Sequence, residues 1–356
     1  MPSLLVNLIL FLLICFIVNI QVASQKEKDK VLIFCAIVQV LFFQTFKDIN
    51  SLPDIPGYIE AYKYICREDA TYLGATGYYK MQYGYYIYNK LLSFISDNPY
   101  YFTFVTGGVI SLSYIFFIKK YSPIIWFSLV LYLMSFTQST FVLRQYTAIA
   151  ICIFSFPLLF KQKFIWCGLL WVTAITIHPT AIFYGMIYIL YFIKNDKLLI
   201  TFYVALFLLL YKPLPMFVNL FVDNVDGYLS YLENDSVEYS TTLIYIFIFG
   251  MAYFFIVHEM NSQHKDIDEE TKLMIKMLGV TAIIPLAATF SRTSEIVPRL
   301  LMYFTFVQFV VIAKTLDCIR LRLVKYVAYI LYFFIFFYQF YISDNSRIFD
   351  FKLIFE

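Results

Sequence analysis

The sequence predicts an all-α, polytopic integral membrane protein that forms a single transmembrane domain over residues 1–356. Of its 356 residues, 61% are hydrophobic and only 14% are charged. A soluble domain of this length cannot bury that much apolar side chain. The 32 tyrosines and 40 phenylalanines suit helices whose ends carry interfacial aromatic residues. The net charge of +3 is too small to indicate a partner made of nucleic acid.

The apolar segments predict about twelve transmembrane helices. A spanning helix needs about twenty apolar residues, and somewhat fewer when aromatic residues lie at its ends. Several candidates are short, so a count of ten or eleven is also open. In chain order, the candidates are residues 4–22, 31–46, 101–118, 124–142, 146–160, 164–177, 180–193, 198–211, 242–257, 273–290, 300–313 and 324–342.

The charged connecting segments predict the orientation of these helices. Six of them alternate onto one face and hold sixteen of the 27 Lys/Arg and nine of the 24 Asp/Glu. Short loops rich in Lys/Arg stay in the cytoplasm. We therefore expect both termini and the two long loops, 47–100 and 212–241, on the opposite, extracytoplasmic face. The six segments are 25–30, 119–120, 161–163, 194–197, 258–276 and 314–325.

Arg144 is the single charge between Lys120 and Lys161. Residues 121–160 form about 60 Å of helix at 1.5 Å per residue, twice the hydrocarbon thickness. The chain must therefore reverse within this stretch, and Arg144 falls where the turn has to be. We expect it at the N-terminus of the second helix, where the helix dipole favours an anion.

A second reversal is predicted at His178-Pro179, in the middle of residues 164–193. Proline disfavours helical geometry in the residue before it, so His178 marks a break. One long kinked helix with His178 at mid-membrane is the alternative. The hairpin is preferred, because the kinked helix would place Lys163 and Lys194 on opposite faces.

These predictions gather basic side chains at the outer face. An arginine there is ordinarily an interfacial anchor with its head among lipid phosphates. Several together indicate a site for a phosphate-bearing ligand, because the guanidinium fork matches phosphate oxygens. The residues concerned are Arg144, His178, Arg292 and Arg299.

Two further stretches carry a family resemblance. VLRQYTAIAI, followed by TIHPTAIFYGMIYIL, resembles the paired RQ and H-x-[ST]-A signatures of the EpsG family of bacterial polytopic proteins. PDIPGYIEAYKYI, YGYYIYNKLLSFI and VPRLLMYF resemble its early aspartate pattern, its Gly-Tyr segment and its late Arg-x-x-x-Tyr. The likeness covers residues 50–195 well and 290–305 weakly. Gln82 departs from the family, where an acidic residue commonly precedes the Gly-Tyr segment.

The resemblance implies a Wzy-like polysaccharide polymerase of exopolysaccharide, capsule or O-antigen synthesis. Such an enzyme joins polyprenyl-pyrophosphate-linked oligosaccharides at the outer face of the bacterial inner (cytoplasmic) membrane. It needs no cofactor and no metal, and it works among membrane lipids alongside a flippase and a chain-length regulator. A GT-C-like arrangement is a candidate for its fold.

The residues then take expected roles. Arg144, Arg299 and Arg292 would hold the pyrophosphate. His178, or failing that Asp54, would act as the base, although a histidine capping a broken helix and an aspartate in a turn are the alternatives. Aromatic faces in the outer segments would stack on sugar rings or lie in the interfacial belt. Those tyrosines are Tyr58, Tyr62, Tyr85 and Tyr303.

Three rival functions remain open at this point. The chain is a lipid-linked oligosaccharide flippase or another transporter, a non-enzymatic scaffold of an assembly complex, or an enzyme that transfers one glycosyl group without chain growth. Few strongly polar residues interrupt the apolar segments, which disfavours a transporter. No glycine-rich phosphate loop ending in Gly-Lys is present in the sequence, so ATP is not indicated as an energy source.

Overall fold

The computed structural model describes residues 3–52, 54–211, 239–258, 267–291, 296–342 and 351–355. Within these ranges the chain is helical and contains no β-strand, apart from an isolated bridge between Lys47 and Leu353. It divides into two compact units, each considered by itself below. Unit 1 runs to His178 and resumes at Val327; unit 2 comprises Pro179–Tyr326.

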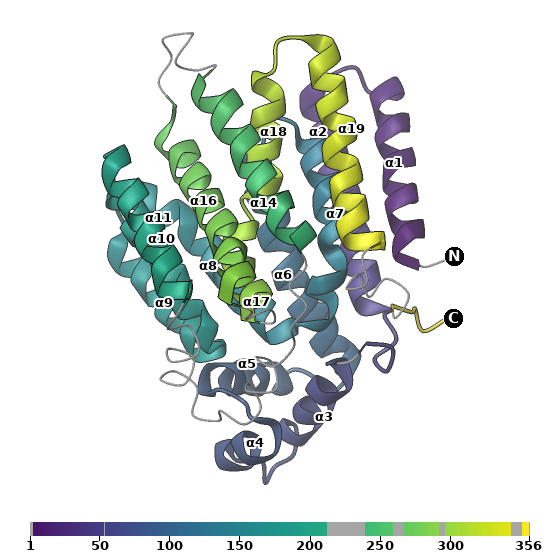
Figure 1. Ribbon diagram of the computed structural model, residues 1–356. Coiled ribbons are helices and arrows are strands. Elements are labelled where there is room, and N and C mark those ends of the chain that lie inside the picture. Colours follow the sequence, from purple (N-terminus) through teal and green to yellow (C-terminus); the bar gives the residue numbers. More distant parts are fainter. Residues whose placement is uncertain are drawn as a thin grey trace. The chain divides into compact units, whose positions relative to one another are not determined.

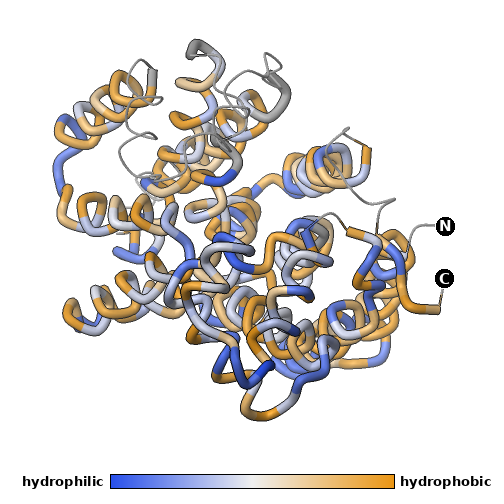
Figure 2. Tube along the Cα trace, turned by 90° about the horizontal axis from the view of Figure 1, so that it is seen from below, coloured by the Kyte–Doolittle hydropathy of each residue, from blue (hydrophilic) through white to orange (hydrophobic). Residues whose placement is uncertain are grey.

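Long apolar helices form most of unit 1 (Figure 1), and Figure 2 shows orange, hydrophobic residues along the helices of the chain, with blue and white residues between them. Each matches a segment predicted from the sequence, because long apolar runs have few alternatives to helix in lipid. The helices are α1 (Ser3–Gln21), α2 (Gln25–Thr45), α6 (Pro99–Tyr121), α7 (Ile125–Phe141), α8 (Leu143–Phe160), α9 (Phe164–Ile177), and α19 (Arg322–Phe337) with its extension η3 (Tyr338–Ile342).

Three further helices of unit 1 lie inside the predicted loop 47–100. They are α3 (Ile55–Ile65), α4 (Tyr72–Tyr79) and α5 (Tyr83–Ser93), and they gather at one end of the unit (Figure 1). α3 buries Ile55, Ile59, Tyr62 and Ile65, which follow one another at helical spacing along one face. We call α3–α5 the cover layer.

The chain reverses between α7 and α8, as the length of residues 121–160 predicts. A three-residue turn joins α6 to α7, and Tyr114 of α6 stacks on Tyr132 of α7 with ring centroids 5.1 Å apart. α8 runs parallel to α6, since Tyr114 lies 6.4 Å from Tyr146 and Tyr121 lies 5.6 Å from Phe156. α7 and α8 are therefore antiparallel.

The predicted break at His178 is also confirmed. α9 ends at Ile177, His178 has an extended backbone (φ −147°, ψ 118°), and the next helix starts at Pro179. The proline ring explains the extended conformation of the residue before it. The two halves of the predicted hairpin belong to different units, so the hairpin itself stays a prediction.

Unit 2 contains the remaining predicted segments, again as helices. The segment predicted at 300–313 is wrong in one respect, because it consists of two helices bent by 46° between Thr305 and Gln308. The elements are η1 (Pro179–Gly185), α10 (Met186–Phe192), α11 (Asp196–Tyr211), α14 (Tyr239–Ala252), η2 (Tyr253–His258), α16 (Glu269–Ser291), α17 (Ile296–Thr305) and α18 (Gln308–Cys318).

Five described helices are long and apolar enough to cross a membrane, and the bent pair makes a sixth. The chain is therefore a membrane protein. The predicted count of about twelve spans is not confirmed, because several apolar helices are shorter than eighteen residues, and it stays a prediction. The five helices are Ser3–Gln21, Pro99–Tyr121, Leu143–Phe160, Glu269–Thr289 and Arg322–Ile342.

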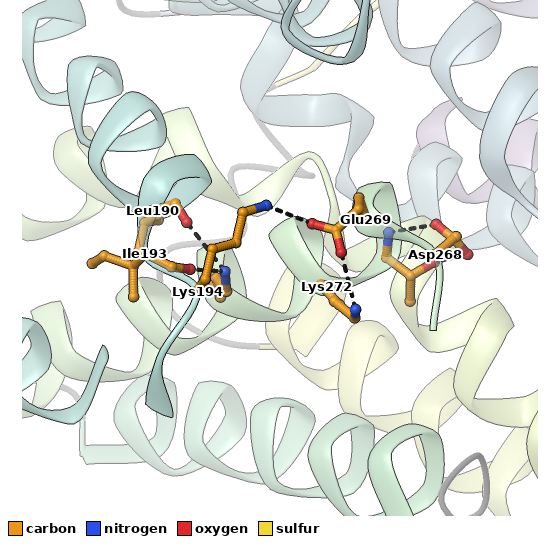
Figure 3. A network of polar contacts seen from close by, with 8 residues as sticks. Leu190, Ile193, Lys194, Asp268, Glu269 and Lys272 are labelled. Carbon is orange, nitrogen blue, oxygen red and sulfur yellow. Dashed lines mark hydrogen bonds and ion pairs between the residues drawn. The ribbon is translucent and has the colours of Figure 1, made fainter. Parts of the chain in front are cut away.

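A polar network joins connecting segments of unit 2 (Figure 3). Glu269 pairs with Lys194 at 2.8 Å and with Lys272 at 2.9 Å, and Lys314 lies 3.7 Å from Asp268. These residues come from three of the six segments that the charge pattern places on one face. Within unit 2, the structure thus brings those segments to the same end.

A neighbouring lysine of the network connects α16 to α10. The ammonium group of Lys276 donates to the main-chain carbonyls of Leu190 and Ile193 at the end of α10, and Figure 3 labels these two acceptor residues. Carbonyl groups at a helix C-terminus lack partners within their own helix and favour a cation. Lys276 therefore fastens the end of α10 to α16.

Candidate functional site

Arg144 occupies the first turn of α8, at the point where the chain reverses. Val142 separates the two helices with φ −86° and ψ 53°, and α8 begins one residue later. The Arg144 side chain is half-buried, and its Nη1 donates to the main-chain carbonyl of Lys80 at 3.0 Å. Lys80 ends α4 in the left-handed conformation with φ 47°, which turns that carbonyl out of the helix. Arg144 thus joins the start of α8 to the cover layer.

Tyr85 of α5 lies beside Arg144. Its side chain is 1% exposed, and burial raises the pKa of the phenol well above its usual value, while the nearby Arg144 cation opposes this rise. The ring meets Tyr58 of α3 edge-on at 6.1 Å and stacks with Tyr88 at 6.0 Å. Aromatic rings of the cover layer therefore surround a hydroxyl next to a guanidinium group.

The end of α9 also lies under α5. A Cβ atom added to Gly84 would stand 2.2 Å from the Thr176 hydroxyl oxygen, so only glycine allows α5 to approach α9 this closely. His178 follows two residues later, is buried, and donates its main-chain N–H to the carbonyl of Ala174 at 2.9 Å. The cover layer therefore lies over the ends of both α8 and α9, which carry Arg144 and His178.

Lys47 is a member of this region that the sequence analysis missed. Its side chain is fully buried, and its Nζ donates to the main-chain carbonyl of Thr140 and to Gln44 Oε1 at 3.1 Å. Thr140 lies in the last turn of α7, where free carbonyls and the helix dipole attract a cation. Burial lowers the pKa of Lys47 to about 7. Lys47 thus holds the end of α7 two residues before the reversal at Val142.

The sequence carries no strong signal for this role. Lys47 stands between FFQTF and DIN, at the start of what reads as a polar loop. Nothing in that pattern predicts that the end of α7, some ninety residues later, receives its side chain. The neighbouring Gln44 is also buried, and Gly107 of α6 leaves the room that its side chain fills.

Unit 2 brings together two other segments that carry the resemblance. Thr180, two residues after His178, donates its hydroxyl to the hydroxyl of Tyr303 at 3.2 Å. Tyr303 is fully buried in α17, and Arg299 lies one helical turn earlier with a half-buried side chain. Within unit 2, Thr180 and the Arg-x-x-x-Tyr stretch therefore meet through a hydrogen bond.

Two other predicted residues take positions of their own. Asp54 is exposed and precedes the first turn of α3, with no side-chain hydrogen bond that caps the helix. Tyr62 is fully buried, stacks on Phe102 at 4.8 Å and donates its hydroxyl to the carbonyl of Ser96. The ring and the hydroxyl of Tyr62 thus both contact other parts of the protein, and its role in glycan binding stays a prediction.

Some predictions fall outside the described residues. Arg292 is one of them, and so is nearly all of the predicted loop 212–241.

The arrangement at the end of unit 1 suits the binding of an anion. Arg144 presents a cation in the first turn of α8, where unpaired main-chain N–H groups also attract negative charge. Arg144 is half-buried beside the aromatic cover layer, and this partial burial strengthens its electrostatic interactions relative to those of a fully solvated cation. A phosphate group bound here would be accompanied by tyrosine rings suited to contact with a sugar.

Comparison with known proteins identifies the family of the chain. No curated protein and no solved structure matches the chain. The model of the EpsG family matches residues 30–353, which include all of the cover layer, α8, α9 and α17. On this match over nearly its whole length, the chain belongs to the EpsG family.

Proposed function

We propose that this chain is a polysaccharide polymerase that joins polyprenyl-pyrophosphate-linked oligosaccharide repeat units. The single observation that carries the proposal is Arg144, in the first turn of α8 beneath an aromatic cover layer. Family membership supports the same reading, because the EpsG family is associated with polysaccharide polymerases. The product would be an exopolysaccharide, a capsule or an O-antigen.

The reaction replaces one bond to a sugar with another. The acceptor hydroxyl oxygen attacks the anomeric carbon of the growing glycan, and the bond from that carbon to the pyrophosphate oxygen breaks. The electron pair leaves on polyprenyl pyrophosphate, and the hydroxyl proton passes to a base. Arg144 stabilises the negative charge that develops on the leaving group. Stabilisation of this kind by preorganised donors is usually the largest single contribution to the rate of an enzyme.

His178 is the base in this proposal. It lies at the end of α9, beneath the same cover layer as Arg144. Asp54 is the alternative, since it is exposed at the start of α3, one helical turn before Tyr58. A base needs to reach the acceptor hydroxyl directly or through one water molecule.

Arg299 would supply a second cation to the pyrophosphate. Its place on α17, one turn before Tyr303, connects it to Thr180 through the hydrogen bond between those two hydroxyls. Thr180 follows His178 by two residues in the chain. Within unit 2, Arg299 thus lies one turn before the tyrosine that Thr180 contacts.

We place this end of unit 1 at the outer face of the bacterial inner membrane. The start of α1 lies beside the end of η3, because the Tyr341 hydroxyl donates to the carbonyl of Leu4 at 3.3 Å. Leu353 pairs with Lys47, which in turn reaches Thr140 near the reversal of the chain. Both terminal segments thus lie at the end that carries Arg144, as the charge pattern requires if this end is extracytoplasmic.

Reconstitution in liposomes tests the proposal. The purified protein receives a lipid-pyrophosphate-linked repeat unit without nucleotide, and the products are sized by gel electrophoresis or mass spectrometry. A ladder of longer products made by the wild type and absent in His178→Gln supports the polymerase. Products that carry one added unit and never grow longer would instead establish single glycosyl transfer.

The same vesicles distinguish the remaining rivals. Intact repeat units that cross the bilayer without growing would establish a flippase. A protein that binds the lipid-linked unit, yet neither moves nor extends it even with its flippase and chain-length partners present, would be a scaffold. Either result would contradict the polymerase.

A further inference from the structure

α5 and the residue before it carry a row of polar side chains that face the protein. Tyr85 and Asn89 lie one turn apart on one side of α5, and the half-buried Gln82 is the N-cap residue immediately before the helix. Tyr85 and Asn89 are each 1% exposed. An apolar face is the ordinary solution for a short helix that packs on a membrane bundle, so this polar row requires an explanation.

The polar atoms of this row are poorly satisfied. Gln82 Oε1, the Tyr85 hydroxyl and Asn89 Oδ1 are shielded from solvent and make no hydrogen bond of good geometry with the described residues, although the Asn89 amide lies close to the Tyr85 hydroxyl. Arg144 Nε is shielded and unpaired in the same way. Each buried polar group without a partner costs about 1–3 kcal/mol. Such groups persist where a ligand completes their hydrogen bonds.

The set of unpaired groups defines the chemistry of that ligand. The oxygens of Gln82 and Asn89 only accept hydrogen bonds, whereas Arg144 Nε only donates and the Tyr85 hydroxyl does both. Phosphate oxygens match Arg144 Nε but would repel the amide oxygens. Sugar hydroxyls match the amide oxygens and the Tyr85 hydroxyl. A sugar joined to a phosphate therefore pairs with all four groups, and a bare phosphate does not.

The surrounding rings fit the same ligand. Tyr58 and Tyr88 flank Tyr85 at 6.1 and 6.0 Å. Tyrosine rings give a sugar an apolar contact surface while their hydroxyls remain available at the edges. The hydroxyl of Tyr88 is already engaged with Thr106 at 2.9 Å, so Tyr88 is part of the wall.

We infer that the α5 face made by Gln82, Tyr85 and Asn89 is a sugar subsite, which binds the first sugar of the lipid-linked glycan beside the pyrophosphate held by Arg144. The inference rests on the proposed function for the identity of the carrier. The four unpaired atoms are shielded in this structure. A sugar therefore reaches them once the side chains around them move, and the hydrogen bond from Arg144 to the Lys80 carbonyl is exchanged for one to phosphate.

Direct binding tests the subsite without requiring turnover. The probes are farnesyl pyrophosphate and the same carrier bearing one glucose, galactose or N-acetylglucosamine, titrated into detergent-solubilised protein. Wild-type protein should bind at least one of the glycosylated carriers about tenfold more tightly than the bare carrier. Tyr85→Phe and Gln82→Met should each remove most of this preference and leave the affinity for the bare carrier within about twofold.

Tyr88→Phe is the matched control, because it removes a neighbouring hydroxyl that is already paired within the protein. It should keep the full preference for the glycosylated carrier. The inference is overturned if the wild type binds the bare carrier as tightly as all three glycosylated ones. It is equally overturned if Tyr85→Phe weakens both kinds of carrier alike, since the hydroxyl would then serve the phosphate alone.

The result is separable from that of the proposed function. A protein that shows the sugar preference and its loss in Tyr85→Phe, but makes no ladder in liposomes, has the subsite and is not a polymerase. A protein that makes a ladder without the preference is a polymerase whose sugar contacts lie elsewhere.

Discussion

At the scale of single residues, Arg144 and Lys47 of unit 1 have different roles. Arg144 is half-buried and carries more donors than its hydrogen bond to the carbonyl of Lys80 uses. Lys47 is fully buried, and its ammonium group is directed to the end of α7. Arg144 is therefore suited to bind a ligand, whereas Lys47 stabilises the fold at the end of α7.

Arg144→Lys should reduce polymerisation at least a hundredfold while the protein folds and accumulates normally. Lysine keeps the positive charge but loses the planar fork that fits two phosphate oxygens. Sized products from liposomes give the rate, and quantified membrane protein gives the level. Arg67→Lys is the matched control, because Arg67 is an exposed arginine of the cover layer, 5.9 Å from the Tyr64 ring. Full activity in the Arg144 variant would reduce Arg144 to an interfacial anchor.

Lys47 should make stability depend on pH. Its pKa is about 7 in the folded protein and near 10.5 when solvated, so the unfolded chain binds more protons between these values. Stability therefore rises with pH from about 7 upward, by at most about 1.4 kcal/mol per pH unit. Below pH 7 the full cost of burying the charge is present.

Thermal unfolding of Lys47→Met in detergent measures this effect. The melting temperature of the wild type relative to this variant should rise steadily between pH 7 and pH 9. Lys63→Met, at an exposed position of α3, should show no such trend relative to the wild type. A pH-independent difference for Lys47→Met would mean that the lysine keeps its proton over the whole range.

At the scale of elements, the contact between α5 and α9 depends on one glycine. Gly84→Ala places a methyl group 2.2 Å from the Thr176 hydroxyl and 2.8 Å from the main-chain carbon of Thr176, so α5 must move outward. We expect polymerisation to fall at least tenfold. Gly77→Ala in α4 meets nothing within 4 Å and should keep full activity, with stability unchanged or slightly raised. Equal activity of the two variants would show that the seating of α5 is irrelevant to function.

The junction of α10 and α16 depends on a lysine in the same way. Lys276→Met removes the donor to the carbonyls of Leu190 and Ile193 and leaves them without their cation. The expected loss is about 1–3 kcal/mol in unfolding experiments. Lys272→Met, which breaks only a pairing with Glu269 at the surface, should cost less than about 1 kcal/mol. A reversed order would contradict the role given to Lys276.

The elements also show what sequence can predict here. Apolar runs predicted every long helix, because lipid leaves the backbone no alternative, and the length of residues 121–160 predicted the reversal near Arg144. The three helices of the cover layer were missed. They are short, glycine-containing and rich in tyrosine, and a helix such as α5 buries Tyr85 and Asn89 where an apolar stripe would ordinarily be read.

At the scale of the whole molecule, the sequence predicted which residues belong to the candidate site but not the contacts that hold them in place. The sequence named Arg144 and His178 as residues of one end, since both lie at breaks between apolar runs. It did not indicate that Gly84 seats α5 on α9, or that Lys47 reaches the end of α7. Both contacts join residues about ninety positions apart, and such pairings depend on packing that no local pattern encodes.

The proposed polymerase requires the cover layer to lie on the extracytoplasmic side of the membrane. In a variant without its six native cysteines, single cysteines are placed at Tyr78 of α4 and at Lys161, between α8 and α9, both of which are exposed. A membrane-impermeant maleimide added to intact cells should label position 78, and should label position 161 only after the membrane is broken. Labelling of position 161 from outside, with position 78 protected, would place Arg144 at the cytoplasmic face and contradict an extracytoplasmic polymerase.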